Sequence, residues 1–352
     1  MMQSAKITKT PINATFELTP RCNLDCKMCY VHNQDSNALR DRELSTDTWK
    51  RIFDEAYDCG LMFASLTGGE CLLRHDFKEL YLHLWKKRVY ITVMTNGVLL
   101  DDEYVAFFKT YKPQNIRISL YGSSEDGYRK VTGHRGFERA TAAIRSLIAA
   151  GIDVKVSVTP SSYIKDDYIS ILRLCRENKW KYIPGEFHLV ENRDDPEKND
   201  HYLTEEEIIG LAKEKALLSG PLTPVEHELP PCGGTCTQAP KGLACNAGKI
   251  STVVSWDGRM LLCTAIPVSK ASVLEMPYAQ AWEKTKEAAQ ELLLGAECVD
   301  CPYDKLCPRC PAMRLTGFYT GHCNPKVCDV TRRLVAAGVK KLGDPEKVDE
   351  PI

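Results

Sequence analysis

The chain has 352 residues, and its charges nearly balance, with 46 lysine and arginine against 47 aspartate and glutamate residues. This balance gives no reason to expect a nucleic acid or a membrane surface as a partner. The N-terminus lacks the apolar core of a secretory signal, and no run of about 18 apolar residues suggests a membrane span. We therefore expect a cytoplasmic protein of two domains, in which the 16 cysteines serve as metal ligands more readily than as disulfides.

Strand-like runs alternate with helical patterns through the first two thirds of the chain. Strands are expected at Ala14–Leu18, Leu61–Leu66, Val89–Thr95, Ile116–Leu120, Ile152–Val158 and Glu186–Val190. Helices are expected at Ser45–Ala56, Asp76–Lys87, Asp101–Phe108, Phe137–Ala150 and Asp166–Asn178, with another at Thr204–Leu218. Six strand–helix units predict an α/β fold with a parallel sheet and right-handed crossovers. Because six units are too few for a closed eight-stranded barrel, we expect an open partial barrel of the (β/α)6 type.

After the first expected strand, one stretch of eight residues contains three cysteines in the spacing C-x3-C-x2-C. They are Cys22, Cys26 and Cys29. Such a short loop can wrap three thiolates around one iron–sulfur cubane. One iron is then left without a local ligand, and an open metal position is where a substrate can bind. Structural zinc is the alternative, but it prefers paired C-x2-C knuckles that this loop lacks. Disulfides are disfavoured by the compartment.

This loop, with Tyr30 directly after its third cysteine, resembles the radical S-adenosylmethionine (SAM) superfamily. The resemblance implies a [4Fe-4S] cluster on Cys22, Cys26 and Cys29, whose open iron is chelated by the amino and carboxylate groups of SAM. It further implies that reduction cleaves SAM to methionine and a 5′-deoxyadenosyl radical, which abstracts a hydrogen from the substrate.

A Gly68-Gly69-Glu70 turn follows the second expected strand. Paired glycines let a backbone approach a ligand closely and expose amide groups, and Glu70 could accept from an ammonium group. A plain turn is the alternative. After a strand and a cysteine loop, the triplet resembles the family motif that binds the methionine amino group of SAM. The family usually has proline next; here it is Cys71, either a buried thiol or a residue near SAM.

Other SAM contacts are expected where later strands end, since ligands of such sheets bind at the carboxyl ends of the strands. The resemblance assigns Thr95 and Asn96 to the ribose or carboxylate of SAM, and Ser119 to SAM. It places Arg129 on the methionine carboxylate, which suits an arginine fork; the alternative for Arg129 is a solvated helix residue. Val158 is expected to pack against adenine.

Ten cysteines lie beyond residue 230: Cys232, Cys236, Cys245, Cys263, Cys298, Cys301, Cys307, Cys310, Cys323 and Cys328. Ser255-Trp256-Asp257-Gly258-Arg259 predicts a β-hairpin that brings Cys245 and Cys263 together from its two ends. Prolines from Pro221 to Pro231 mark a boundary. We expect a partial-barrel domain in residues 1–220 and a cysteine-rich domain, with a C-terminal helix and tail, in residues 221–352.

The tail resembles the SPASM extension of radical SAM enzymes, which carries two auxiliary [4Fe-4S] clusters. The resemblance assigns Cys245, Cys263 and Cys310 to the first cluster, either completed by Cys232 or Cys236 or left with an open iron. It assigns Cys298, Cys301 and Cys307 to the second, with Cys328 or its competitor Cys323 as the distal ligand. The family spacing C-x2-C-x5-C-x3-C is C-x2-C-x5-C-x2-C here. A two-zinc ribbon is the alternative.

Together the resemblances imply an oxidoreductase that modifies a ribosomally made peptide (a RiPP maturase), by a thioether or carbon–carbon crosslink, epimerisation or oxidation. Formylglycine-forming sulfatase maturation is a second hypothesis, weakened because Thr264 stands where those enzymes have aspartate. A non-catalytic iron–sulfur electron-transfer protein is a third, but it would need no SAM pocket. The stretch before Ala14 is too short for a folded leader-recognition module, so a separate recognition protein is expected. An electron donor such as flavodoxin or ferredoxin is also expected.

Overall fold

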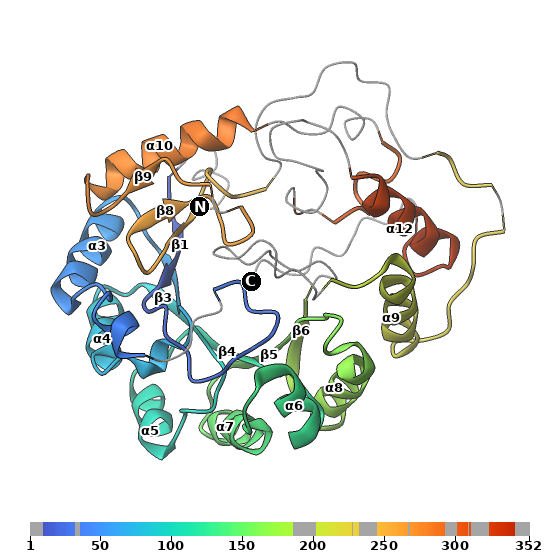
Figure 1. Cartoon of the computed structure of the whole chain (residues 1–352), viewed down its shortest axis with the longest axis horizontal. Coiled ribbons are helices and arrows are strands. Elements are labelled where there is room, and N and C mark those ends of the chain that lie inside the picture. Colours follow the sequence, from blue (N-terminus) through green and yellow to red (C-terminus); the bar gives the residue numbers. More distant parts are fainter. Residues whose placement is uncertain are drawn as a thin grey trace. The chain divides into compact units, whose positions relative to one another are not determined.

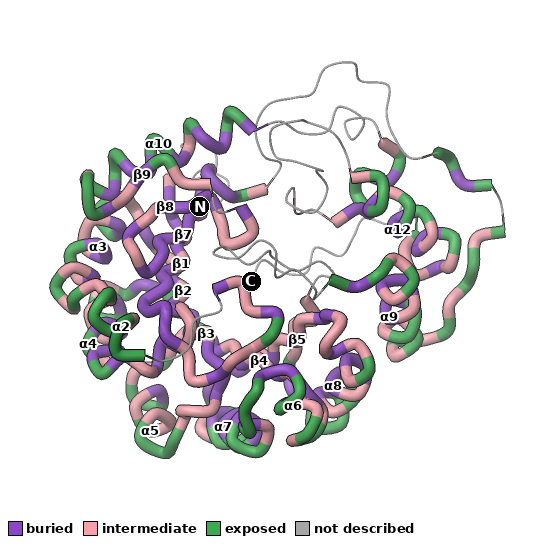
Figure 2. The backbone as a smooth tube through the Cα atoms, viewed as in Figure 1, coloured by how far each residue is buried: buried purple, intermediate pink, exposed green. Residues whose placement is uncertain are grey.

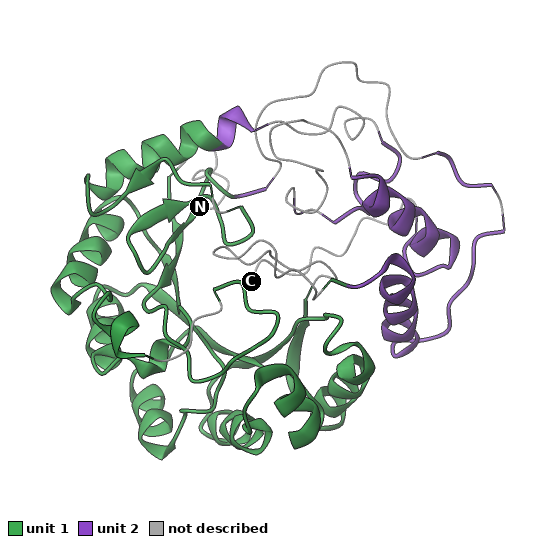
Figure 3. Cartoon of the chain, in the orientation of Figure 1, with its two compact units in different colours: residues 1–202, 247–288 green, residues 203–246, 289–352 purple. Residues whose placement is uncertain are grey.

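The computed structural model describes residues 10–31, 36–185, 202–226, 228–231, 245–266, 268–292, 301–308, 310 and 324–341. The chain forms two compact units, Met1–Tyr202 with Ala247–Ala288, and Leu203–Asn246 with Ala289–Ile352 (Figure 3). This division differs from the one predicted at residue 220, because residues 247–288 return to the first unit and extend its sheet.

The first unit is built on six parallel strands, in the order β6-β5-β4-β3-β2-β1. They are β1 (Asn13–Glu17), β2 (Phe63–Thr67), β3 (Tyr90–Thr95), β4 (Asn115–Ser119), β5 (Val154–Val158) and β6 (Lys181–Pro184). The first five confirm the predicted strands. The sixth lies earlier than predicted, and the predicted strand Glu186–Val190 falls outside the described residues.

Helices connect the strands and cover the outer face of the curved sheet (Figure 1). They are α2 (Asn37–Arg40), α3 (Thr46–Asp58), the 3-10 turn η1 (Cys71–Leu73), α4 (Phe77–Lys86), α5 (Asp102–Thr110), α6 (Glu125–Thr132), α7 (Phe137–Ala149) and α8 (Lys165–Glu177). The predicted partial barrel of alternating strands and helices is confirmed, with α6 as an unpredicted addition.

Side-chain caps explain where several helices begin. The Ser45 hydroxyl accepts from the Thr48 amide at 3.1 Å, and Asp101 accepts from the Tyr104 amide at 2.9 Å, as the sequence predicts. Asp76 makes no such cap at α4. Its carboxylate instead accepts from the guanidinium of Arg74, at 2.8 and 2.6 Å.

The core of the first unit lies between the sheet and its helices. Strand register aligns one row of fully buried or nearly fully buried residues across the sheet: Phe16, Leu66, Val93, Ile116 and Val154. The Phe16 ring packs edge-on against Trp49 and Phe53 of α3, at centroid distances of 6.2 and 4.9 Å. This row therefore faces the helices, and the residues that alternate with it face the concave side of the sheet. In Figure 2, buried stretches follow the strands, and exposed stretches lie on the outer helices.

The predicted hairpin is confirmed as β7 (Ser251–Val254) and β8 (Arg259–Leu261). β7 pairs in parallel with β1, and β8 continues to β9 (Ala271–Ser272), so the sheet has nine strands. Contacts with α3 hold this extension: Arg51 donates to the carbonyl of Val273 at 3.0 Å. Glu55 accepts from the Tyr278 amide at 2.7 Å, at the start of α10 (Tyr278–Glu291).

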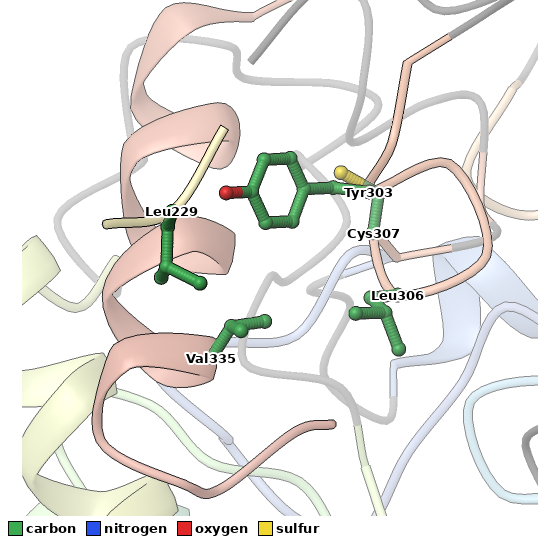
Figure 4. Packing of buried hydrophobic residues seen from close by; sticks show 5 residues of the cluster. All are labelled: Leu229, Tyr303, Leu306, Cys307 and Val335. Atoms are coloured by element: carbon green, nitrogen blue, oxygen red, sulfur yellow. The ribbon is translucent and has the colours of Figure 1, made fainter. Parts of the chain in front are cut away.

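The second unit contains α9 (Glu205–Leu217) and α12 (Pro325–Ala336), joined by an ion pair of 2.6 Å between Glu206 and Arg333. A small core packs beside α12 (Figure 4) and consists of Leu229, Tyr303, Leu306, Cys307 and Val335. No helix in the described parts of the chain is long and apolar enough to cross a membrane.

Candidate active site

The cysteine loop leaves the carboxyl end of β1 and carries Cys22, Cys26 and Cys29, all partly buried. Its backbone is anchored on the last turn of α6. The Asp25 amide donates to the Thr132 carbonyl at 2.9 Å, and the Lys27 amide donates to the Val131 carbonyl at 3.1 Å. The unpredicted helix α6 thus positions the loop.

The charge of Cys29 contributes to a raised pKa of both Cys22 and Cys26. Burial is the main cause and raises the pKa of Cys22 to about 12; the charges of Glu70 and Cys29 add to it. Burial, Cys29 and Cys22 raise the pKa of Cys26 well above its usual value. Three thiolates at this place therefore need a compensating cation, which iron supplies to coordinating thiolates.

The three thiols of the loop are a donor set that fits a cubane. Among the residues that the structure describes, no group of three His, Cys, Asp or Glu side chains is arranged to hold one metal ion. A [4Fe-4S] cluster binds each thiolate at a different iron, so its ligands do not converge on one point.

The Gly68-Gly69-Glu70 turn makes a close backbone approach, as predicted, but to the chain's own segment before the cysteine loop. The amides of Gly69 and Glu70 donate to the carbonyls of Thr19 and Arg21, at 2.8 and 2.7 Å. A Cβ on Gly69 would lie 2.2 Å from the Arg21 carbonyl oxygen, and Gly68 has a φ of 148°. These two amides are therefore engaged within the protein.

Replacing Gly69 by alanine should lower the free energy of unfolding by about 1–3 kcal/mol, because the new methyl group meets backbone that has no room to move. Gly210→Ala in α9 is the matched control. Nothing lies within 4 Å of its added Cβ, so it should be neutral or stabilising by about 0.5–1 kcal/mol. Urea unfolding of both variants provides the measurement, and equal midpoints would contradict the packing argument.

Glu70 is fully buried and lies at the centre of a hydrogen-bond network. Its carboxylate accepts from the Thr95 hydroxyl at 2.8 and 2.9 Å, the Asn96 amide at 2.7 Å and the Leu72 amide at 3.1 Å. Burial nevertheless raises the pKa of Glu70. In this structure its oxygens thus join the ends of β2 and β3, whereas the sequence suggested an acceptor for an ammonium group.

Asn96 connects this hydrogen-bond network to the cysteine loop. Its side-chain amide donates to the Asn23 side chain at 2.7 Å and lies 3.9 Å from the Cys22 sulfur. The structure thus brings together four predicted site residues: Cys22, Glu70, Thr95 and Asn96. Cys71 next to them is fully buried, and its thiol donates to the Met94 carbonyl at 3.5 Å, which matches the buried-thiol alternative.

The other predicted SAM contacts differ in how far they are buried. The Tyr30 hydroxyl donates to Glu17 at 3.5 Å, and Ser119 is partly buried at the end of β4. Val158 is fully buried on the helix-facing side of β5. The Arg129 side chain is 63% exposed on α6, and its guanidinium lies 3.9 Å from the Asp126 carboxylate. The SAM contacts of these residues stay predictions.

Two tyrosines beside the cysteine loop escaped the sequence analysis. Tyr128 on α6 is fully buried, and its ring lies 6.3 Å from that of Tyr121, which follows β4. Burial raises the pKa of both phenols, and the charge of Cys26 is the next cause for each. The only sequence signal is that Tyr121-Gly122 directly follows the expected strand Ile116–Leu120.

The auxiliary ligand sets stay predictions. Cys263 belongs to the first unit, and the second unit holds the described residues Cys245, Cys301, Cys307, Cys310 and Cys328. Cys307 is buried in the small core of Figure 4, with its sulfur 3.4 Å from the Thr331 hydroxyl. Four predicted or alternative ligands fall outside the described residues: Cys232, Cys236, Cys298 and Cys323.

Known proteins match different shares of the chain. AlbA of Bacillus subtilis, named as an antilisterial bacteriocin subtilosin biosynthesis protein, is 34% identical over 151 residues. That match covers 42% of this chain and 33% of AlbA, so it spans only about a third of that relative's length. The AdoMet-dependent heme synthase of Methanosarcina barkeri is 25% identical over 326 residues, which cover 87% of this chain and 93% of that protein.

Solved structures share the fold. Streptococcus suis SuiB bound to precursor peptide SuiA aligns with a TM-score of 0.67 at 16% identity, over 93% of this chain and 78% of that chain. The family model described as the Radical SAM superfamily matches residues 16–181, the segment that contains the cysteine loop and the strands β2 to β5. Residues 16–181 of this chain are therefore a radical SAM domain.

Proposed function

We propose that this protein is a radical SAM enzyme that modifies a peptide. The observation that carries the proposal is the group of three mutually interacting thiols at the carboxyl end of the sheet, tied to Glu70 through Asn96 and Asn23. An electron carrier would need no such connection between the cysteine loop and the ends of β2 and β3. A reducing, cytoplasmic setting is part of the proposal, because thiols persist there.

Each group of residues in this site would have a separate role. Cys22, Cys26 and Cys29 would hold a [4Fe-4S] cluster which, together with SAM, supplies the chemistry of hydrogen abstraction. The backbone anchor on α6 fixes the loop, and the buried Glu70 fixes Asn96 and Thr95. Because the Glu70 carboxylate accepts from Thr95, Asn96 and Leu72, and the Glu70 carbonyl accepts from the Leu73 amide, the carbonyl oxygens of Gly68 and Gly69 would accept from the amino group of SAM.

The peptide substrate is proposed from two relatives. AlbA is named for the biosynthesis of a bacteriocin, and SuiB has been solved with a precursor peptide. An open sheet, in which β6 is an edge strand among the described residues, suits a peptide chain that continues on both sides of the reacting residue. The heme synthase supports a second candidate, a small-molecule substrate, because its match covers nearly the whole chain. Thr264 beside Cys263 continues to disfavour sulfatase maturation.

The substrate class can be tested by mass spectrometry. The anaerobically reconstituted protein, given SAM, dithionite and peptides encoded beside its gene, should alter one peptide. We expect loss of a pair of hydrogens for a crosslink or an oxidation, or solvent-deuterium exchange at Cα for an epimerisation. A separate leader-recognition protein and a flavodoxin or ferredoxin are proposed partners and belong in a second arm. If a small molecule consumes SAM in stoichiometric turnover while no peptide changes, the heme-synthase-like alternative replaces this one.

We also propose that the cysteine-rich tail binds iron. Three four-iron cubanes, one in the cysteine loop and two held by cysteines beyond residue 230, predict about twelve irons per chain after reconstitution. Elemental analysis for iron and zinc provides the measurement. An iron content near four with stoichiometric zinc would instead support the two-zinc ribbon.

A further inference from the structure

Three cations lie side by side on the concave face of the sheet. In β4, Ile116 and Ile118 are fully buried on the helix side, so Arg117 between them faces the concave side. Strand register places Arg117 beside Lys155 of β5, and Lys155 beside Lys181 of β6. Residues in register on neighbouring parallel strands share a face, and such strands are about 4.8 Å apart.

Two of these cations have no counter-charge among the residues that the structure describes. Lys181 forms an ion pair with Asp153. Within the described residues, neither Arg117 nor Lys155 has an ion pair or a side-chain hydrogen bond, and the Nε of Arg117 is buried without a partner. Adjacent like charges destabilise a sheet, and a buried donor without an acceptor costs free energy. Burial also lowers the pKa of Arg117, in agreement with a guanidinium held away from water and from any carboxylate.

We propose that Arg117 and Lys155 form a carboxylate-binding site on the concave face, which takes an acidic group of the peptide substrate. That group is an aspartate or glutamate side chain, or the C-terminal carboxylate. An arginine fork binds a carboxylate through two parallel hydrogen bonds, and the lysine adds a second positive charge. The assignment to a peptide rests on the proposed function; the preference for a carboxylate rests on the two unpaired cations.

The place of the pair in the strand relates it to the reacting end of the barrel. Ser119, an expected SAM contact, follows Arg117 by two residues on the same face, about 6.6 Å along the strand. A carboxylate bound to Arg117 would thus lie two residues before Ser119 along β4, on the same face as this expected SAM contact. Binding there would determine which residue of the substrate reaches the reacting end of the barrel. The methionine carboxylate of SAM is the other possible source of the charge, so the experiment must separate the two.

Lysine footprinting separates these sources. The anaerobically reconstituted protein is acetylated with a water-soluble N-hydroxysuccinimide ester, and the labelling rate of each lysine is read by mass spectrometry. N-acetylglutamate α-amide, added in the presence of SAM, should slow labelling of Lys155 severalfold, whereas the neutral N-acetylglutamine α-amide should not. Lys109, exposed on α5, is the internal control. Protection by SAM alone, with no further effect of the glutamate probe, would assign the site to SAM and overturn the proposal, as would equal effects of the two probes.

Variants give an independent test. Arg117→Met should abolish the protection of Lys155 by the glutamate probe and leave SAM affinity, measured by equilibrium dialysis, within about twofold. Arg117→Lys should restore part of the protection, which a merely misfolded variant would not show, and Arg173→Met on the exposed side of α8 should behave as wild type. A tenfold loss of SAM affinity in Arg117→Met would overturn the proposal. If the peptide proposal itself is wrong, the enzyme would turn over SAM while no peptide is altered, which is a different result.

Discussion

Replacing Cys22, Cys26 and Cys29 together by alanine should abolish the formation of 5′-deoxyadenosine from SAM with dithionite. The three thiols are the only ones in the loop, and the raised pKa values of Cys22 and Cys26 show that they share one partly buried environment. Cys71 cannot replace them, because it is fully buried and donates to the Met94 carbonyl. Anaerobic assay of the reconstituted variant by chromatography provides the measurement.

The same variant separates the cysteine loop from the tail. Its iron content should fall from about twelve to about eight per chain, because only one of the three proposed cubanes is lost. Cys59→Ala is the matched control, since Cys59 is a partly buried thiol at the end of α3 and should not affect SAM cleavage. Undiminished SAM cleavage in the triple variant would refute the assignment of the cluster to this loop.

Local patterns in the sequence predicted most of the first unit. Strand-like runs located β1 to β5, with β-branched residues in Val89–Thr95 and alternation in Ile152–Val158, and Ser45 and Asp101 stood at predicted helix starts. β6 was misplaced because Lys181–Pro184 offers a weaker strand pattern than the apolar run that follows it. The difference at β6 lies where strand propensity is weak, so that pairing with β5 determines which residues form the strand.

Long-range pairing accounts for the other differences. The hairpin was predicted from Asp257-Gly258, but nothing local indicates that β7 would pair in parallel with β1, more than two hundred residues earlier. The short helix α6 was missed because it contains Gly127 and lacks a long apolar stripe. Its importance appears only in the structure, where its last carbonyls hold the cysteine loop.

In the candidate site, too, local motifs indicated the segments but not the contacts between residues far apart in the sequence. The cysteine spacing and the turn at Gly68-Gly69 indicated segments that lie side by side in the structure, where a Cβ on Gly69 would meet the Arg21 carbonyl oxygen. The sequence could not show what Glu70 contacts, because Thr95 and Asn96 lie 25 and 26 residues away along the chain. Motifs thus located the site, whereas the roles within it depend on side chains that meet only after folding.

Glu70→Ala should lower the free energy of unfolding of the first unit by about 2–4 kcal/mol, because the variant leaves the Thr95 hydroxyl and the Asn96 and Leu72 amides without their buried acceptor. Glu79→Ala on α4 is the matched control and should change stability little, since the exposed Glu79 only pairs with Lys50 on the surface. Urea-dependent hydrogen exchange of the β2 and β3 peptides provides the measurement. Equal losses in the two variants would contradict the role given to the buried network.

The size of this loss should also depend on pH. Burial holds the pKa of Glu70 above its unfolded value, so the folded protein binds a proton more tightly at this carboxyl than the unfolded chain does. The stability linked to this proton is fully present below the unfolded pKa and is lost as the pH rises through the folded pKa. Alanine cannot titrate, so the difference between wild type and Glu70→Ala should be larger at mildly acidic pH than at neutral pH. A difference that instead grows from acidic to neutral pH would mean that the hydrogen bonds from Thr95, Asn96 and Leu72 outweigh burial and hold Glu70 ionised.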